Sequence, residues 1–460
     1  MMPVSSSRHG LSILLACLAM LCAGVLPASA ADMAATVHKS KVEVHQAPDF
    51  GSPEVAKLRR GDGVTVAGQQ GLWFQVKLAD GGSGYLRVTD VRMEHAAQEG
   101  GDANVRALFT GQAGKGRVTE TAGVRGLDES TLKSASLDAG ELKAMEGNRV
   151  TAEAAASHAR AQGWDATRFA YATEADTGKQ GGASQSEKRG GFGLARSLLG
   201  SLTGGAIGGS GDAVLDVADS AIGKSEEEIL AEELALGPEL AGRVLGAAPL
   251  WPDAQAQRRV NLIGRWMASQ TTRPDLPWTF GVIDSPEINA FAAPGGYVLV
   301  TRGMYELLAN DAEIAAVLGH EISHVVQRDH YNVIHKQQVT RSGIRAAAGQ
   351  VGTGNIAESY AKDYAEKFGA GVLLSGLDRD AEYRSDQAAG VYLVRSGFNP
   401  LALYAVLQKM TAFGTQSASL AQLHRTHPPL DDRLDRMDRG GVPGLDRYNS
   451  REVGVKAGGS

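Results

Sequence analysis

The pattern H-E-x-x-H at residues 320–324 constrains this chain more than any other stretch, because it requires a helix with two imidazoles on one face. Residues four apart share a helix face, so His320 and His324 can bind one metal ion while Glu321 reaches a water molecule on that metal. Apolar residues recur at helical spacing from 307 to 325. The pattern predicts an amphipathic helix whose inner side holds a hydrolytic metal centre, with Glu321 as the general base.

Composition and charge narrow the class of protein. A chain of 460 residues with 43% hydrophobic content and 58 glycines predicts more than one core, separated by linker. The formal net charge is −6, and no block of Lys and Arg stands out, so we expect no nucleic-acid partner. No segment after the first thirty residues reaches the about 18 uninterrupted apolar residues of a membrane span, so none is expected.

Residues 1–30 have the features of a secretory signal peptide. An apolar run from 11 to 26 follows a basic residue, and small residues at 28–30 form a cleavage site. Both cysteines, Cys17 and Cys22, lie inside this segment, so the exported chain would have no thiol. We therefore expect a periplasmic protein. An outer-membrane lipoprotein anchored through Cys17 is the alternative, which the apolar residues after Cys17 disfavour.

Short β-prone runs separated by Gly, Pro and Asp fill residues 36–93 and predict a small all-β barrel. Their order resembles bacterial SH3-like domains. The resemblance rests on Pro48 and on residues 58–62, 71–76 and 84–86. It implies peptidoglycan or peptides as partners, while a spacer without a ligand stays an alternative. Trp73 and Tyr85 are candidate platform residues, although Trp73 suits the core of so small a barrel.

Two segments contain few large apolar residues. Residues 94–224 are rich in Ala, Gly and Ser, and we expect a linker with short helices. Residues 441–460 are expected to form a flexible tail. Neither segment is assigned any chemistry.

A helical domain is predicted for residues 225–440. Ser225 and Glu228 form a capping box, and an apolar stripe follows. Strands are expected at 278–283 and 297–301, before the H-E-x-x-H helix. The fold class is therefore α+β, an α-rich domain with a short sheet beside the active-site helix.

Catalytic zinc usually takes three protein ligands, so a third is needed beside His320 and His324. His330 stands where a longer pattern, H-E-x-x-H-x-x-G-x-x-H, would place one. That pattern needs glycine at 327, whereas this chain has Gln327, a good helix former. If the helix continues, His330 lies about 240° round the axis from His324, at roughly 100° per residue. We therefore expect His330, and likewise His335, to be an exposed helix histidine.

Glu382 is the second candidate for the third ligand. Asp386 follows it four residues later on a predicted helix, so Glu382 could bind the metal while Asp386 orients an imidazole. Acidic pairs at this spacing are more often solvated surface residues. The residues alone leave this choice open.

Five ordered blocks resemble the HtpX-like and CAAX-prenyl-protease type of zinc metallopeptidases, over roughly residues 226–440. The blocks are residues 289–298, 301–303, 320–324, 382–386 and 426–429. The resemblance is closest to soluble bacterial envelope members. It implies a zincin-type domain with one Zn²⁺ per chain, Glu382 as third ligand and Asp386 as its supporting residue. The hydrophobic spans of the integral-membrane relatives are absent, which favours a periplasmic substrate.

Gly295, Gly296, Tyr297 and Val298 are predicted to form the strand to which an extended substrate adds. Glycine lets another backbone approach closely, and β-addition takes its affinity from main-chain hydrogen bonds. Such binding tolerates many sequences, which suits a metalloendopeptidase acting on extended or misfolded envelope proteins. The alternatives are an adaptor that acts through the SH3-like domain, with latent proteolysis, and a zinc hydrolase of another bond.

His427 is the last candidate site residue, in a block that the resemblance places beside the active site. Two prolines after it predict a stiff, non-helical segment. His427 could donate to the oxyanion of the tetrahedral intermediate. It could instead occupy the fourth position on zinc in a resting state, or merely pack at a turn, as we expect for His424.

Overall fold

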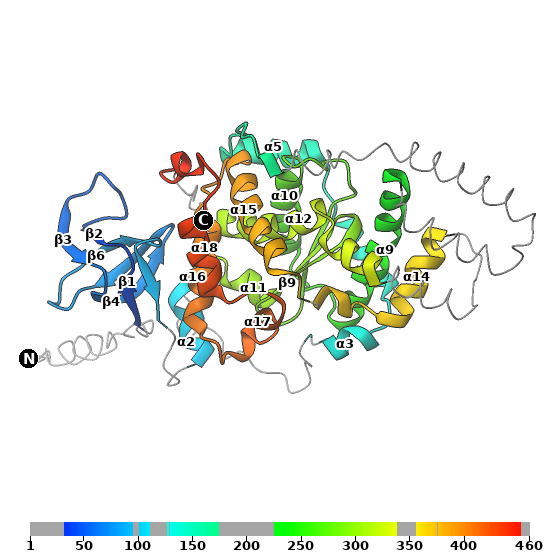
Figure 1. The fold of residues 1–460 in the computed structure, drawn as a ribbon, viewed down its shortest axis with the longest axis horizontal. Coiled ribbons are helices and arrows are strands. Elements are labelled where there is room, and N and C mark those ends of the chain that lie inside the picture. Colours follow the sequence, from blue (N-terminus) through cyan, green and yellow to red (C-terminus); the bar gives the residue numbers. More distant parts are fainter. Residues whose placement is uncertain are drawn as a thin grey trace, which may run out of the picture.

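The computed structural model shows an N-terminal β-sheet beside a larger helical domain (Figure 1). It describes residues 32–94, 101–110, 127, 129–173, 225–337, 356–374 and 376–451. The predicted signal peptide lies outside these ranges. Within them, no helix has both the length and the apolar character needed to cross a bilayer.

The N-terminal part is a seven-stranded antiparallel sheet in the order β3-β2-β6-β5-β4-β1-β7. The strands are β1 (Met33–Val37), β2 (Lys41–His45), β3 (Glu54–Arg59), β4 (Gly63–Gln70), β5 (Trp73–Lys77), β6 (Ser83–Arg87) and β7 (Val91–Met93). Alternate side chains point inward, so Val42, Val44 and Phe74 are buried in the core. The all-β prediction is confirmed. Trp73 is buried as predicted, at 6% exposed, although its neighbour Phe74 takes the inner face and Trp73 lies on the outer side of the sheet.

The helical domain is built around α12, the helix that carries the H-E-x-x-H pattern. Its helices include α9 (Glu226–Ala247), α10 (Ala254–Ala268), α11 (Arg302–Leu307), α12 (Asp311–Val326), α14 (Ile356–Phe368), α15 (Arg379–Arg395), α16 (Ala402–Phe413), α17 (Leu423–Thr426) and α18 (Leu430–Arg439). The Asn310 side chain accepts from the Glu313 amide and begins α12. Contacts with α10, α15 and α16 bury residues 312–325 without a break. The helix is thus buried all round, rather than amphipathic as predicted.

The small sheet consists of β8 (Thr279–Ile283), β9 (Ala290–Ala293) and β10 (Tyr297–Thr301), in the order β8-β10-β9. β10 is the central strand, parallel to β8 and antiparallel to β9. Tyr297 and Val298 therefore have no free edge for a substrate, and the predicted substrate strand is wrong. Gly295 and Gly296 instead turn the chain between β9 and β10, with φ of 75° and 101°.

Part of the predicted linker is core. This segment contains α2 (Gly101–Thr110), α3 (Glu129–Ser134), α4 (Ala139–Gly147) and α5 (Ala152–Gln162). α4 packs on α9 and α5 on α10, and Met145 is fully buried. The ring centroid of Trp164 lies 4.7 Å from that of Phe398. The predicted short helices are present, but they pack into the core because alanine faces allow close helix packing with few large side chains.

The predicted tail is also packed as far as Arg451. The carbonyl of Asn449 accepts hydrogen bonds from Arg87 at 2.8 Å and from Asn399 at 3.0 Å. This segment therefore contacts both the N-terminal sheet and the helical domain. Residues 452–460 lie outside the described ranges.

Candidate metal centre

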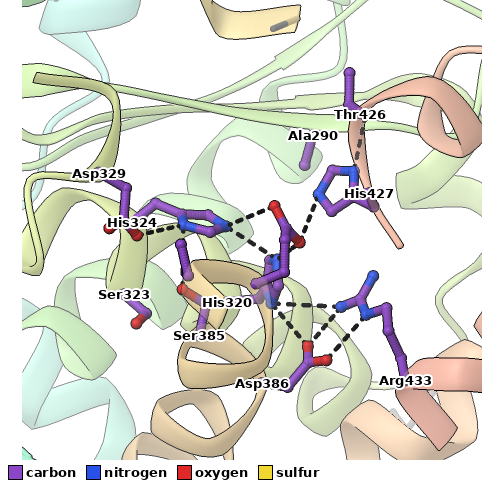
Figure 2. Close-up of polar contacts among 12 residues, drawn as sticks. Ala290, His320, Ser323, His324, Asp329, Ser385, Asp386, Thr426, His427 and Arg433 are labelled. Atoms are coloured by element: carbon purple, nitrogen blue, oxygen red, sulfur yellow. Dashed lines mark hydrogen bonds and ion pairs between the residues drawn. The ribbon is translucent and has the colours of Figure 1, made fainter. Parts of the chain in front are cut away.

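Four side chains from three places in the sequence meet beside α12. His320 and His324 come from α12, Glu382 from α15 and His427 from the residue after α17. Figure 2 shows the three imidazoles turned toward one point, where ligand atoms of all four residues lie within 4.8 Å of one another. Three of the four side chains are almost fully buried, and His427 is 12% exposed.

The distances fit a tetrahedral metal ion. Ligand bonds of about 2.0–2.1 Å place the ligand atoms roughly 3.3–3.4 Å apart. The two Nε2 atoms of His320 and His324 are 3.1 Å apart, and Glu382 Oε2 lies 3.5 Å from His320 Nε2. His427 Nε2 lies 3.7 Å from the same oxygen. The set of nitrogen and carboxylate donors is one that zinc prefers.

A buried carboxylate oxygen without a hydrogen-bond donor also indicates a metal site. Glu382 Oε2 is buried and has no hydrogen-bond donor. Burial alone would raise the pKa of Glu382, but His427, His320 and His324 lower it far below its ordinary value. A buried oxygen of an ionised carboxylate without a donor is costly, and a metal cation bound beside it would offset that cost. The site therefore fits a metal ion.

A carboxylate stands behind each α12 imidazole. Asp386 Oδ1 is 3.0 Å from His320 Nδ1, and Asp329 Oδ2 is 2.8 Å from His324 Nδ1. Each contact turns Nε2 toward the metal position. Burial would lower the pKa of His320, but Asp386 and Glu382 raise it to about 9, so metal binding would displace a proton there.

Arg433 holds Asp386 in place. Its guanidinium donates to both carboxylate oxygens of Asp386, at 2.6 Å and 3.0 Å, and all of these atoms are buried (Figure 2). Burial would raise the pKa of Asp386, yet Arg433 and His320 lower it to about 2. Asp386 therefore stays ionised, as a residue that orients a ligand must.

Glu321 is buried beside the ligands, with 5% of its surface exposed. Burial raises its pKa, and the neighbouring His320 and His324 oppose that effect. A carboxylate with a raised pKa is better matched to accept a proton near neutral pH. Glu321 lies outside the group of four converging residues and remains free to act on a water.

The structure corrects the prediction for His330. α12 ends at Val326, and Arg328 adopts a left-handed φ of 61°. The turn carries Asp329 back to His324 and buries His330, whose ring centroid lies 5.9 Å from that of His324. His330 is thus buried rather than exposed, because α12 stops at Val326 and His330 lies in the helical segment 329–337 that follows the turn. It also lies outside the group of four.

Buried ion pairs hold this turn. Glu233 of α9 accepts from Arg328 Nε at 3.0 Å and from Arg273 Nη2 at 2.6 Å. Arg273 also donates to the carbonyl of Val325 at the end of α12, at 2.9 Å. The sequence patterns did not predict the roles of Asp329 and Arg433. They also did not predict the ion pairs of Glu233 with Arg273 and Arg328. The only signal for Asp329 was an acidic residue shortly after the second histidine.

His335 and His424, the other two histidines considered in the sequence, lie outside the metal centre. His335 is half-buried and stacks on Tyr331, with ring centroids 5.9 Å apart, so it is less exposed than predicted. His424 is half-buried on α17.

Asp329→Asn is expected to lower metal affinity by about 10- to 100-fold, because an amide holds the imidazole less firmly than a carboxylate does. Competition with a chelator measures this affinity. Asp380→Asn, at an exposed position on the same helix as Glu382, is the control and should leave affinity unchanged. Equal affinity of the Asp329 variant and the wild-type chain would remove Asp329 from the centre.

Comparison with known proteins agrees with the geometry. Residues 254–439 match Peptidase family M48, and residues 40–91 match the Bacterial SH3 domain. The Beta-barrel assembly-enhancing protease of Escherichia coli (strain K12) is 29% identical over 252 residues, which cover 52% of this chain and 50% of the relative. Protease HtpX of Pseudomonas fluorescens (strain SBW25) is 30% identical over 197 residues, which cover 35% of this chain and 65% of the relative.

A third relative is the Mitochondrial metalloendopeptidase OMA1 of Schizosaccharomyces pombe, 26% identical over 164 residues, which cover 36% of this chain and 47% of the relative. The chain thus spans about half the length of several relatives that it matches.

Proposed function

We propose, for a chain that carries an M48 metallopeptidase domain behind a bacterial SH3 domain, that it hydrolyses peptide bonds in extended or misfolded envelope proteins. One observation carries the proposal. His320, His324 and Glu382 present their ligand atoms to one point, with the carboxylate of Glu321 beside them. The name of the Escherichia coli relative connects that protein with β-barrel assembly, which supports an envelope substrate and a periplasmic location.

His320, His324 and Glu382 would hold one zinc ion. When bound, zinc polarises the scissile carbonyl and lowers the pKa of a water molecule to about 7. Glu321 takes a proton from the attacking water and returns it to the leaving nitrogen. Asp386 and Asp329 keep the two imidazoles oriented throughout.

The substrate would pair with β9 rather than β10. β9 is an edge strand of the small sheet and packs against α12. Pairing along β9 would use main-chain hydrogen bonds, so cleavage would tolerate many sequences.

Cleavage of a permanently unfolded protein such as reduced casein tests this function. We expect the exported chain to cleave it, a chelator to stop cleavage and added zinc to restore it. Binding of purified cell wall without any cleavage under these conditions would favour the adaptor. Cleavage of an ester but not of casein would favour a hydrolase of another bond.

We propose that His427 blocks the metal in the resting enzyme. Burial lowers the pKa of His427 to about 3, against the opposing effect of Glu382, so its imidazole is neutral and able to bind a metal. Thr426 Oγ1 lies 2.8 Å from its Nδ1, which leaves Nε2 toward Glu382. With four protein ligands, no position is left for water.

His427→Ala is expected to raise kcat/KM for an unfolded substrate by up to about tenfold, because it removes a closed state that competes with substrate. Metal content should stay at the wild-type level, since three ligands remain. His424→Ala, on the neighbouring helix and outside the centre, is the control. A loss of activity with full metal content would instead assign His427 to the oxyanion.

A further inference from the structure

A cavity of about 440 Å³ lies where the N-terminal sheet meets the helical domain. Its walls include Lys41, Phe50, Trp73 and Arg87 from the sheet, and Leu401 and Asn449 from the helical domain. None of these residues belongs to the metal centre. The cavity is therefore a separate feature that the proposed hydrolysis does not use.

One wall of the cavity is aromatic. Trp73 and Arg87 face each other across β5 and β6 on the outer side of the sheet. Phe50 packs on Trp73 with ring centroids 4.8 Å apart, yet it remains 57% exposed. Within the described ranges, no other large apolar side chain is as exposed. An open aromatic ring beside a cavity is a contact surface for an apolar group.

The other wall is charged: three cations, Lys39, Lys41 and Arg87, line the cavity together with two carboxylates, Glu43 and Asp90. Arg87 is 8% exposed, and its guanidinium carbon lies 5.1 Å from the ring centroids of both Phe50 and Trp73. Its Nη2 donates to the carbonyl of Asn449, and among the described residues no carboxylate lies within ion-pair distance of the guanidinium. The nearby Asp90 carboxylate is already paired with Lys39, at 2.8 Å.

Arg87 keeps its charge despite this burial. Burial lowers the pKa of Arg87 to about 10, with Asp90 acting against that effect, so the guanidinium is protonated at neutral pH. A second cation, Lys41, lines the same cavity and is exposed. A buried cation without an ion-pair partner is costly, and an anion bound in the cavity would offset that cost.

We propose that this cavity binds a peptide carboxylate together with the apolar side chain next to it, as at the C-terminal end of a polypeptide. Arg87 and Lys41 would take the carboxylate, while the exposed ring of Phe50 would contact the side chain. A guanidinium offers paired donors that match a carboxylate. Trp73 is only 6% exposed, so it has no open face on which a cell-wall sugar could stack.

This cavity would be a second substrate-binding site, separate from the metal centre. The inference rests on the proposed function only in taking those substrates to be polypeptides. Binding can be measured without cleavage, in the full exported chain with Glu321→Gln. Failure of the peptidase proposal and failure of this one are therefore separate results.

Fluorescence anisotropy with three labelled peptides tests the ligand. The first ends in Ala-Phe with a free carboxylate, the second is its C-terminal amide, and the third is amidated but has an internal Glu-Phe. We expect the free acid to bind at least about tenfold more tightly than the amide. Equal affinity of acid and amide overturns the proposal, as does binding of muropeptides but of none of the three peptides.

The third peptide distinguishes a C-terminal carboxylate from the side-chain carboxylate of an internal glutamate. Weak binding of the internal Glu-Phe peptide assigns the site to chain ends. Affinity equal to that of the free acid would keep the carboxylate site but overturn its assignment to chain ends.

Substitutions locate the site. Phe50→Ala should weaken binding of the free acid by about fivefold. Because the Phe50 side chain is exposed, its removal should not disturb folding. Arg87→Gln should reduce the preference for acid over amide to near unity. Val55→Ala, 47% exposed in the same domain but outside the cavity, is the control. Unchanged binding in both the Phe50 and Arg87 variants would overturn the assignment.

Discussion

Glu321→Gln is expected to lower hydrolysis of an unfolded protein by about 10² to 10⁴, the usual contribution of a positioned acid–base group. Glutamine has nearly the shape of glutamate but cannot accept the proton of the attacking water. Because Glu321 is not one of the four converging residues, the variant should keep its metal and its fold. Initial rates on casein, together with metal content after dialysis, measure both effects.

Glu366→Gln is the matched control for this experiment. It makes the same chemical change at an exposed position of α14. Its activity should equal that of the wild-type chain. Full cleavage by a metal-loaded Glu321→Gln chain would contradict the role of Glu321 and with it the peptidase mechanism.

Glu382→Gln is expected to cause the largest loss of metal. The substitution removes the only carboxylate among the four converging residues, and a neutral amide is a poor ligand for zinc. The loss should exceed the about 10- to 100-fold cost of changing a residue behind a ligand. Metal content after dialysis against a chelator series is the measurement.

His330→Ala is the matched control for Glu382. His330 is also buried and lies close to His324, but it is outside the group of four. Its removal should leave metal content nearly unchanged, although a buried side chain is lost. Similar metal loss in both variants would show that packing, and not coordination, explains the effect of Glu382→Gln.

Local patterns predicted individual elements well. The Ser225 capping box is present at the start of α9, and the strand expected at 297–301 coincides with β10. Helix caps and β-branched runs depend on neighbours within a few residues, so the sequence contains them directly. The same holds for the two histidines on α12, whose spacing places them on one face.

Local sequence patterns could not predict the backbone angle of a single residue or the order of strands in the sheet. Gln327 suits a helix, yet α12 ends there because Arg328 turns left-handed and is held by Glu233 from α9. β10 reads as a strand open to substrate, but β8 and β9 flank it. Both outcomes depend on contacts between segments far apart in the sequence.

The sequence by itself determined the parts of the candidate metal centre: the helix with His320 and His324, the proposed base Glu321, and, through resemblance, Glu382. Only the tertiary structure decided how these parts meet. It placed His427 opposite Glu382 and set Asp329 and Arg433 behind the ligands. It also placed Arg87 in the cavity, where no carboxylate of the described residues lies at ion-pair distance from its guanidinium. The reason is physical: coordination and charge compensation depend on distances of a few ångströms between elements, which packing sets and local spacing does not.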